Sequence, residues 1–313
     1  MALVISEKET RELIDMKQAL KVVEQIFHDR AGGKVRSLPR RRLRSSTRQL
    51  NIMAAWQADW DLIGLRAYMG GANTITLYNG QSGELSLVLN ARYLSSLRTG
   101  AASGVAAKYL APKNSKILGL IGTGKQATFQ VEAIVGACKV QQVLVFGRNP
   151  ERRTDFIRQM SQVIPVELKE SPSIEAVERE SDIFVLATDS TTSITDGSHL
   201  KDEVLVITMG ANATAKHEVS TDLIQRMDLV VTDDIPTAQY GSGDLVDACE
   251  SGLTQWEDVI PLERIVSGKE QSPQAKKILF QSNGIADEDL AVAHYVWDQA
   301  QKKKLKLKSI PGL

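Results

Sequence analysis

The pattern of hydrophobic and polar positions divides the chain into two parts. The first part begins with a short apolar strand at 2–5, followed by the capping box Ser6-x-x-Glu9 and a helix that starts near Asp15. A series of β-like runs comes next, at 35–44, 48–56, 62–69, 73–79 and 85–89. A helix rich in small residues is expected at about 91–110, before Pro112. This part therefore predicts a β-rich α+β unit.

From residue 116 onward, short apolar runs alternate with helical segments. Strands are expected at 116–121, 142–147, 165–168, 182–188, 203–208 and 228–232. Strands that alternate with helices are typical of a doubly wound parallel sheet. The fold class is therefore α/β, with a Rossmann parallel sheet beside the β-rich unit. The amphipathic helix at 287–302 could pack on that β-rich unit. We predict a discontinuous domain, 1–112 with 286–313, and a dinucleotide-binding domain, 113–285.

The turn Gly122-x-Gly124-x-x-Ala127 follows the strand expected at 116–121 and precedes a helical pattern. Gly122 permits the tight turn, and Gly124 lets the backbone approach a pyrophosphate. Ala127 lets the helix pack closely on the strand, and the free N–H groups at the helix start bind the anion. The strand–turn–helix context favours a bound nicotinamide or flavin dinucleotide over a βα turn that binds nothing.

The next strand ends in Phe146-Gly147-Arg148-Asn149, where an NAD site normally carries Asp or Glu for the ribose 2′-hydroxyl. Here Arg148, Asn149 and Arg152 could hold a 2′-phosphate instead, because guanidinium groups bind phosphate through paired hydrogen bonds. The sequence thus favours NADP(H) over NAD(H). The alternative is that Arg148 faces solvent and NAD binds without its usual acid.

Composition restricts the other classes of function. The formal net charge is zero, from 38 Lys and Arg against 38 Asp and Glu, so no overall field favours nucleic acid or a membrane surface. The arginine-rich run at 36–48 is interpreted as a solvated strand face. Cys138 and Cys249 have no metal-like spacing, so free thiols and no metal site are expected. We expect a cytoplasmic protein, since no run resembles a signal peptide or a transmembrane helix.

Longer motifs resemble the ornithine cyclodeaminase/μ-crystallin family. They are the segment Ala-Arg-Tyr-Leu-Ser-Ser-Leu-Arg-Thr-Gly-Ala-Ala-Ser at 91–103, Gly-Leu-Ile-Gly-Thr-Gly-Lys-Gln at 119–126, Ile-Thr-Met-Gly-Ala-Asn at 207–212 and Phe-Gln-Ser-Asn-Gly-Ile-Ala at 280–286. The resemblance implies a homodimer that acts at the Cα–N bond of a small amino acid or imino acid. Family members include imine and ketimine reductases, amino-acid dehydrogenases, cyclodeaminases and non-catalytic crystallins.

The resemblance also implies roles for individual residues. Arg40 and Arg98 fall where the family holds the substrate carboxylate, and Arg66 could join them. Together with the glycine turn and the ribose site, the expected cofactor contacts are Thr74, Arg98, Thr99, Gly122, Thr123, Gly124, Lys125, Gln126, Arg148, Asn149, Arg152, Thr188, Met209, Asn212, Lys216 and Ser282.

Two departures from the family pattern bear on the reaction. Arg66 replaces the lysine of a Gly-x-Lys motif, and Asn212 replaces the catalytic aspartate of a Gly-x-Asp motif. An Asn amide cannot take up a proton, and the pKa of an Arg is too high to release one. Both titratable groups of cyclodeamination are therefore missing, whereas hydride transfer to a preformed iminium needs mainly orientation.

We therefore expect Arg66 and Asn212 to act in catalysis by holding the carboxylate and the imine nitrogen or the nicotinamide amide. The leading hypothesis is an NAD(P)H-dependent oxidoreductase of the imine-reductase or amino-acid-dehydrogenase type. Two alternatives remain open, an ornithine cyclodeaminase that recycles NAD and a non-catalytic, crystallin-like NADPH-binding protein.

Overall fold

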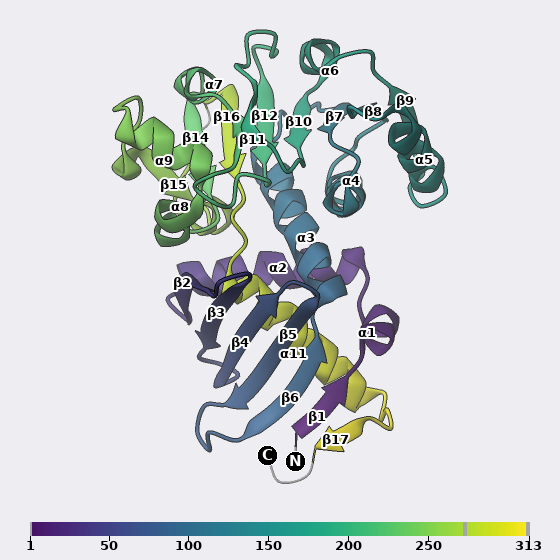
Figure 1. The fold of residues 1–313 in the computed structure, drawn as a ribbon, viewed down its shortest axis with the longest axis vertical. Coiled ribbons are helices and arrows are strands. Elements are labelled where there is room, and N and C mark those ends of the chain that lie inside the picture. The colour runs from purple at the N-terminus through teal and green to yellow at the C-terminus, as the bar shows by residue number, and fades with distance from the viewer. Residues whose placement is uncertain (1, 272–273, 311–313) are drawn as a thin grey trace. The chain divides into compact units, whose positions relative to one another are not determined.

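The computed structural model describes residues 2–271 and 274–310. Its contacts group the chain into two compact units (Figure 1). Unit 1 comprises Met1–Arg98 and Gly284–Leu313, and unit 2 comprises Thr99–Asn283. The chain passes from one unit to the other inside a single helix, α3 (Arg92–Leu110), which the sequence prediction assigned to the first domain alone.

Unit 1 is built on a seven-stranded sheet in the order β17-β1-β6-β5-β4-β3-β2. The strands are β1 (Ala2–Ile5), β2 (Val35–Arg44), β3 (Gln49–Gln57), β4 (Leu62–Met69), β5 (Ala72–Asn79), β6 (Leu85–Asn90) and β17 (Lys308–Ile310). Strands β2 to β6 form an antiparallel meander, and β1 joins β6 in parallel. All the strands predicted in this part are confirmed, and β17 is an addition.

The helices of unit 1 begin as the sequence predicts. Helix α1 (Glu7–Leu13) starts at the capping box of Ser6 and Glu9, and α2 (Met16–Ala31) starts at Asp15, whose side chain accepts the N–H of Gln18. Helix α11 (Ala286–Lys302) packs on strands β2 to β5. Alternate strand residues face this helix and are buried, as the burial pattern of β3 shows, so the other face of the sheet carries half-exposed side chains.

Unit 2 contains a parallel sheet in the order β15-β14-β16-β12-β10-β7-β8-β9. Its strands are β7 (Ile117–Ile121), β8 (Gln142–Phe146), β9 (Glu167–Glu170), β10 (Ile183–Leu186), β12 (Val204–Thr208), β14 (Leu229–Thr232), β15 (Val259–Pro261) and β16 (Lys277–Gln281). A separate two-stranded sheet pairs β11 (Thr191–Thr195) with β13 (His217–Val219).

Short helices connect these strands. They are α4 (Lys125–Ala137), α5 (Pro150–Met160), α6 (Ile174–Glu180), α7 (Thr221–Gln225), α8 (Ile235–Gly241), α9 (Gly243–Glu250), the 3-10 turn η1 (Trp256–Asp258) and α10 (Leu262–Val266). The central strands β10 and β12 are buried at every position, as a parallel sheet covered on both faces requires. The predicted α/β fold class is confirmed.

The strand prediction for unit 2 has one wrong start and is incomplete, because β11, β13, β15 and β16 were not predicted. The third strand begins at Glu167 and not at 165, because Pro165 cannot donate a hydrogen bond to a sheet. Strand β16 was not predicted at all, although it lies between β14 and β12. Its five residues, Lys-Ile-Leu-Phe-Gln, include only three consecutive apolar positions between two polar ends.

Candidate functional site

The glycine turn joins β7 to α4 as expected. Gly122 has φ +104°, and a Cβ atom there would lie 2.4 Å from the carbonyl oxygen of Ala187, so only glycine fits. Gly124 is the extended N-cap of α4, and a Cβ atom at this residue would meet nothing within 4 Å. The space over the start of the helix is therefore open, as close approach by a pyrophosphate would require.

The end of β8 presents basic side chains. Arg148 and Arg152 are both exposed, and no carboxylate occurs at 147–150. The side-chain oxygen of Asn149 accepts the N–H of Arg152 at 2.9 Å, which caps α5. Arg153 plays a structural part, since it donates to the carbonyl of Gly147 at 2.7 Å and pairs with Glu170.

Several expected cofactor residues follow the neighbouring strands of unit 2, at the carboxyl edge of the sheet. Thr188 follows β10, Met209 and Asn212 follow β12, and Ser282 follows β16. The Ser282 N–H donates to the Thr208 carbonyl at 2.8 Å, which fixes the chain beyond β16 to β12. Asn212 donates its amide N–H to the Met209 carbonyl at 3.3 Å.

Lys216 also lies in unit 2, between β12 and β13, where it pairs with Asp189 in the segment that follows β10. Thr99 lies in α3, and its carbonyl accepts the side-chain amide of Gln130 at 3.4 Å. Gln126 lies in the first turn of α4, directly after the glycine turn.

A dinucleotide fits the polar atoms of this edge. The side-chain oxygens of Gln126 and Ser282 are buried and have no hydrogen-bond partner among the described residues. Such atoms are costly unless a ligand or water pairs with them. Both belong to residues that the sequence assigned to cofactor binding. Among the described residues, no group of three or more His, Cys, Asp or Glu is placed to hold a metal ion.

Glu218 is a functional candidate that was not predicted from the sequence. This residue of β13 is fully buried, and its carboxylate accepts hydrogen bonds from the segments that follow β10 and β12. Burial raises the pKa of Glu218 to about 7, although the four donors around it favour the ionised form. No local sequence pattern reveals this role, because the hydrogen-bond partners of Glu218 lie up to 30 residues away.

In unit 1 the three expected substrate arginines come together at the start of α11. Arg66 and Arg98 both bind Asp289, with N···O distances of 3.1 Å and 2.9 Å. Arg98 also binds Glu288 at 2.9 Å. Arg40 lies at the bulge of β2 and donates to the carbonyl of Gly284 at 3.0 Å.

Gly284 holds this cluster tightly packed. A Cβ atom there would lie 2.4 Å from Nη1 of Arg98, and its φ of +75° favours glycine. The acids at the start of α11 were read from the sequence only as a helix beginning. Their partners Arg66 and Arg98 lie about 190 to 220 residues earlier, which no local pattern reveals.

Arg66 is held from three sides. Its Nε donates to Asn73 at 3.1 Å, and its Nη2 donates to Ser95 at 2.6 Å, in addition to the pair with Asp289. Burial lowers the pKa of Arg66 from its ordinary value, while Asp289 favours the charged form. The guanidinium thus sits in a fixed orientation, as a group that positions an anion must.

Thr74 is separated from this arginine cluster. It is exposed on β5, between Asn73 and Ile75, whose side chains lie on the same sheet face as Arg66. Successive strand residues point to opposite faces, so Thr74 faces away from Arg66. Its role in cofactor binding stays a prediction.

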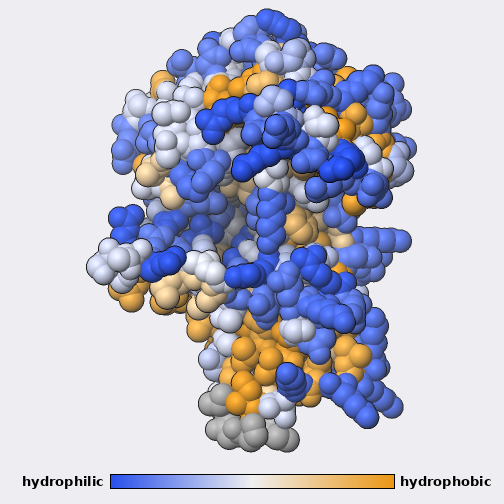
Figure 2. Space-filling view, turned by 45° about the vertical axis from the view of Figure 1, so that its right-hand side comes forward, coloured by the Kyte–Doolittle hydropathy of each residue, from blue (hydrophilic) through white to orange (hydrophobic). Residues whose placement is uncertain are grey.

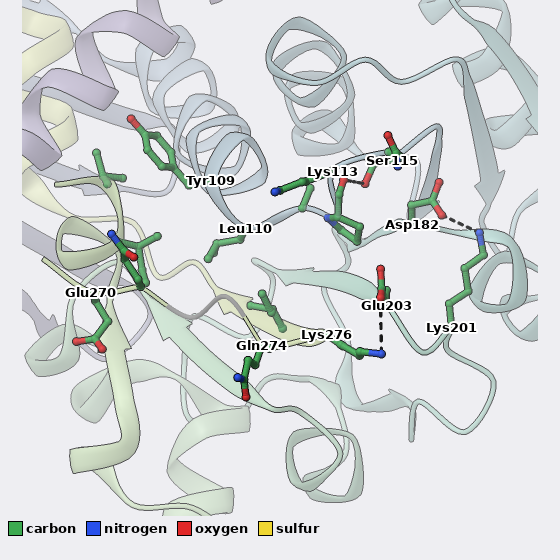
Figure 3. A pocket seen from close by; sticks show the side chains of 18 of the residues that line it. Tyr109, Leu110, Lys113, Ser115, Asp182, Lys201, Glu203, Glu270, Gln274 and Lys276 are labelled. Atoms are coloured by element: carbon green, nitrogen blue, oxygen red, sulfur yellow. Dashed lines mark hydrogen bonds and ion pairs between the residues drawn. The ribbon is translucent and has the colours of Figure 1, made fainter. Parts of the chain in front are cut away.

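A large open cavity of about 1350 Å³ lies elsewhere in unit 2 (Figure 3). Its lining includes Ser115 before β7, Asp182 before β10, Glu203 before β12 and Lys276 before β16. It therefore marks the amino ends of the strands, whereas the glycine turn and Thr188 follow their carboxyl ends. Ligands of open α/β sheets bind at the carboxyl ends, so this cavity is not the candidate site.

The fold combines a Rossmann unit that carries the glycine turn with an antiparallel-sheet unit in which three arginines cluster at the start of α11. The model of the ornithine cyclodeaminase/mu-crystallin family matches residues 2–304. The chain belongs to this family, as the sequence motifs predicted.

Known proteins resemble the chain over most or all of its length. It is 32% identical to a Δ1-pyrroline-2-carboxylate reductase of Bacillus cereus over 231 residues, which cover 72% of this chain and 70% of that one. The structure of Thermococcus litoralis Δ1-pyrroline-2-carboxylate reductase, in complex with NADH and L-proline, has a TM-score of 0.93 at 25% identity and covers 98% and 100% of the two chains. An archaeal alanine dehydrogenase dimer with bound NAD has a TM-score of 0.92 at 27% identity, with 100% and 99% covered.

Proposed function

We propose that this protein is an NAD(P)H-dependent oxidoreductase that reduces the C=N bond of a small 2-imino acid, or oxidises the corresponding amino acid. One observation carries the choice of reaction within the family. The two positions expected to transfer protons hold Arg66, locked in a buried ion pair, and Asn212, a neutral amide. Hydride transfer remains possible with these residues, because it needs the protein mainly to orient the reactants. Ammonia elimination needs a titratable group to carry a proton.

The arginine cluster supplies a site for the substrate carboxylate. At the start of α11, three arginines pair with three acids, and a fourth arginine donates to the neighbouring Gly284 carbonyl. The set comprises Arg30, Arg66 and Arg98, the acids Asp287, Glu288 and Asp289, and Arg40 at Gly284. Positive charges exceed negative ones by one in this set, which matches a single carboxylate. The relatives named for pyrroline-2-carboxylate and alanine act on acids of this class, which supports a small 2-carboxylated substrate.

The residues of this chain would bind and orient the reactants. The carboxyl edge of unit 2 would hold a nicotinamide dinucleotide through the glycine turn, Gln126, Thr188 and Ser282, and this cofactor supplies the hydride. Asn212 would hydrogen-bond the imine nitrogen or the nicotinamide amide. Hydride adds to the imine carbon while the nitrogen keeps its proton, so an iminium becomes an amine without a protein acid.

We further propose that NADP(H) is the preferred cofactor. Arg148 and Arg152 are exposed at the end of β8, and no carboxylate occupies 147–150 to repel a 2′-phosphate. Relatives of known structure bind NAD or NADH, so the preference is a specific expectation for this chain. It is tested by titrating the wild-type protein with NADPH and NADH, and equal affinities would contradict it.

We propose a homodimer formed through the open face of the unit 1 sheet. Figure 2 shows hydrophobic side chains gathered in the lower part of the view, which holds this unit. The half-exposed positions of β3 and β4 include Ile52, Trp56 and Leu65, and Ile63 is 42% exposed. A second copy is the favoured occupant because the related alanine dehydrogenase is a dimer.

Light scattering tests the dimer directly. Wild-type protein should have twice the mass of one chain, and Leu65→Arg should shift it toward the monomer because a charge would be buried in the interface. A wild-type monomer would contradict the proposal.

Cys138 and Cys249 are both free thiols, which supports our placement of the protein in the reducing cytoplasm.

The function is tested with purified protein, NADPH and a panel of substrates. Δ1-Pyrroline-2-carboxylate, Δ1-piperideine-2-carboxylate and pyruvate with ammonia cover cyclic and linear imines. Loss of nicotinamide absorbance together with formation of the amino acid supports the proposal. Tight NADPH binding without turnover on any of these substrates would contradict it.

A further inference from the structure

Glu218 joins the two segments of unit 2 that follow β10 and β12. One carboxylate oxygen accepts the N–H and the hydroxyl of Thr188, at 2.7 Å and 2.8 Å. The other accepts the N–H groups of Met209 and Gly210, at 2.9 Å and 2.6 Å. Each oxygen therefore accepts two hydrogen bonds, which fills its acceptor capacity.

The two segments are packed closely around this carboxylate. A Cβ atom on Gly210 would lie 2.1 Å from the Thr188 carbonyl and 2.7 Å from Glu218 Oε1. The segments thus touch where Glu218 binds both of them. Their separation is set by one side chain that offers acceptors in both directions.

The charged groups around Glu218 include more acids than bases. On α9, Asp244 is buried and accepts the backbone N–H of Glu218 at 3.1 Å. His217 of β13 lies 3.6 Å from both Asp244 and Asp247. In the two flanking segments, Asp189 pairs with Lys216.

Two buried carboxyls so close together do not both ionise readily, so the pair holds a proton near neutral pH. Four donors stabilise the ionised form of Glu218, whereas Asp244 accepts the backbone N–H of Glu218 and lies close to the Glu218 charge. Burial raises both pKa values, that of Glu218 to about 7 and that of Asp244 to about 8, so Glu218 is the member that ionises first as the pH rises.

We propose that Glu218 is a positioning residue for the dinucleotide, whose carboxylate holds the segments after β10 and β12 in the conformation that binds the cofactor. The proposal rests on the proposed function, because Thr188, Met209 and Asn212 are its expected cofactor contacts. Any loss of the carboxylate should loosen these contacts together.

A Gln side chain at position 218 should not hold the two segments together as the Glu218 carboxylate does. It keeps one acceptor oxygen, but its amide N–H groups would face the backbone donors of one segment. Buried donors left without an acceptor cost free energy, and the segments would separate to reach water. Protonated Glu218 meets the same difficulty, since its own O–H must face one of the four donors.

The matched control is Glu178, another buried glutamate of unit 2. It lies in α6 and accepts the hydroxyl of Thr195 on β11, and it has no expected role in cofactor binding. Burial also raises the pKa of Glu178. Glu178→Gln therefore reproduces the general cost of altering a buried carboxyl.

The first experiment measures the NADPH Kd by fluorescence and the Tm for wild type, Glu218→Gln and Glu178→Gln. Glu218→Gln should raise the Kd about tenfold or more, the scale of a lost charge-assisted hydrogen bond. Glu178→Gln should leave the Kd within about twofold of wild type, even where it lowers the Tm. A folded Glu218→Gln protein with wild-type Kd would overturn the proposal, as would equal Kd increases in both variants.

The second experiment follows the ratio of the Glu218→Gln Kd to the wild-type Kd across pH, which cancels the ionisation of the 2′-phosphate. Protonated Glu218 resembles Gln, so the ratio should fall toward one as the pH drops from about 8 to about 5.5. A ratio that stays constant would mean that ionised Glu218 has no special role.

Two further outcomes have a definite meaning. If Glu218→Gln does not fold, the wild-type NADH Kd decides, because its diphosphate does not titrate near neutral pH. This Kd should rise as the pH is lowered through neutrality, and a flat profile would overturn the proposal. Wild-type protein that binds neither nucleotide would refute the proposed function as well, whereas normal binding by Glu218→Gln would refute the role of Glu218 alone.

Discussion

Asp289→Asn tests the arginine cluster most severely. Asp289 is 2% exposed, and its two oxygens accept Nη1 of Arg66 at 3.2 Å and 3.1 Å. One of them also accepts Nε of Arg98 at 2.9 Å. The substitution keeps one acceptor oxygen but removes the negative charge between two buried guanidinium groups.

The expected cost follows from the burial of these charges. Removing one partner of a buried ion pair costs about 3–5 kcal/mol. Because Asn retains one acceptor, we expect the lower end, about 3 kcal/mol. A shift of about 2–4 °C per kcal/mol in a chain of this size then gives a Tm decrease of roughly 6–12 °C.

Scanning calorimetry measures this Tm, with Asp59→Asn as the control. Asp59 forms an exposed pair with Lys34, so its substitution should leave the Tm unchanged within error. Asp289→Asn should also raise the KM for the imino acid, since Arg66 and Arg98 lose their common anchor. A Tm close to that of wild type would refute the reasoning that Asp289 compensates both arginines.

Four other substitutions probe unit 2. Arg148→Asp should weaken NADPH binding by about 1–3 kcal/mol and leave NADH binding unchanged, and an unaltered NADPH Kd would exclude a 2′-phosphate contact. Asp244 has its pKa raised to about 8 from 3.8, so its stabilising effect is present at low pH and is lost as the pH rises through about 8. Asp244→Asn should therefore flatten the fall in Tm between about pH 4 and 8, and parallel Tm curves would contradict this. Gly122→Ala should lower the Tm because its Cβ would lie 2.4 Å from the Ala187 carbonyl. Gly124→Ala meets no neighbouring atom, so it should weaken nucleotide binding at unchanged Tm, and a loss of Tm there would argue against open space at the turn.

Local features of this protein could be predicted from its sequence. The capping box at Ser6, the N-cap Asp15 and the glycine turn at Gly122 each depend on residues within one turn of one another. Alternation of strands and helices gave the α/β class, and the longer motifs gave the family. The expected class of oxidoreductase agrees with the named activities of the relatives.

Features that depend on distant residues could not be predicted. Glu218 became a candidate only when the fold brought the segments around Thr188 and Met209 to the same carboxylate. In the sequence, Asp289 looks like an ordinary residue at the start of a helix. Its partner Arg66 lies 223 residues away in sequence, and only the fold shows that the two are in contact. Ion pairs and hydrogen bonds of this kind leave no periodic signal.

The expected grouping of the arginines needs one refinement. The sequence suggested three guanidinium groups around one carboxylate, and Arg66 and Arg98 do share a neighbour, Asp289. The acids of α11 neutralise most of their charge. The cluster is therefore a preorganised ion network with a small positive excess, and in the proposed function it would favour a weakly charged substrate over a polyanion.

The central claim is that this protein consumes a reduced nicotinamide cofactor and does not eliminate ammonia. The direct test is the stoichiometry of the purified wild-type protein with Δ1-pyrroline-2-carboxylate and NADPH. We predict that one NADPH is oxidised for each proline formed, and that ornithine releases no ammonia. Conversion of ornithine to proline and ammonia, without net oxidation of NADPH, would contradict the account.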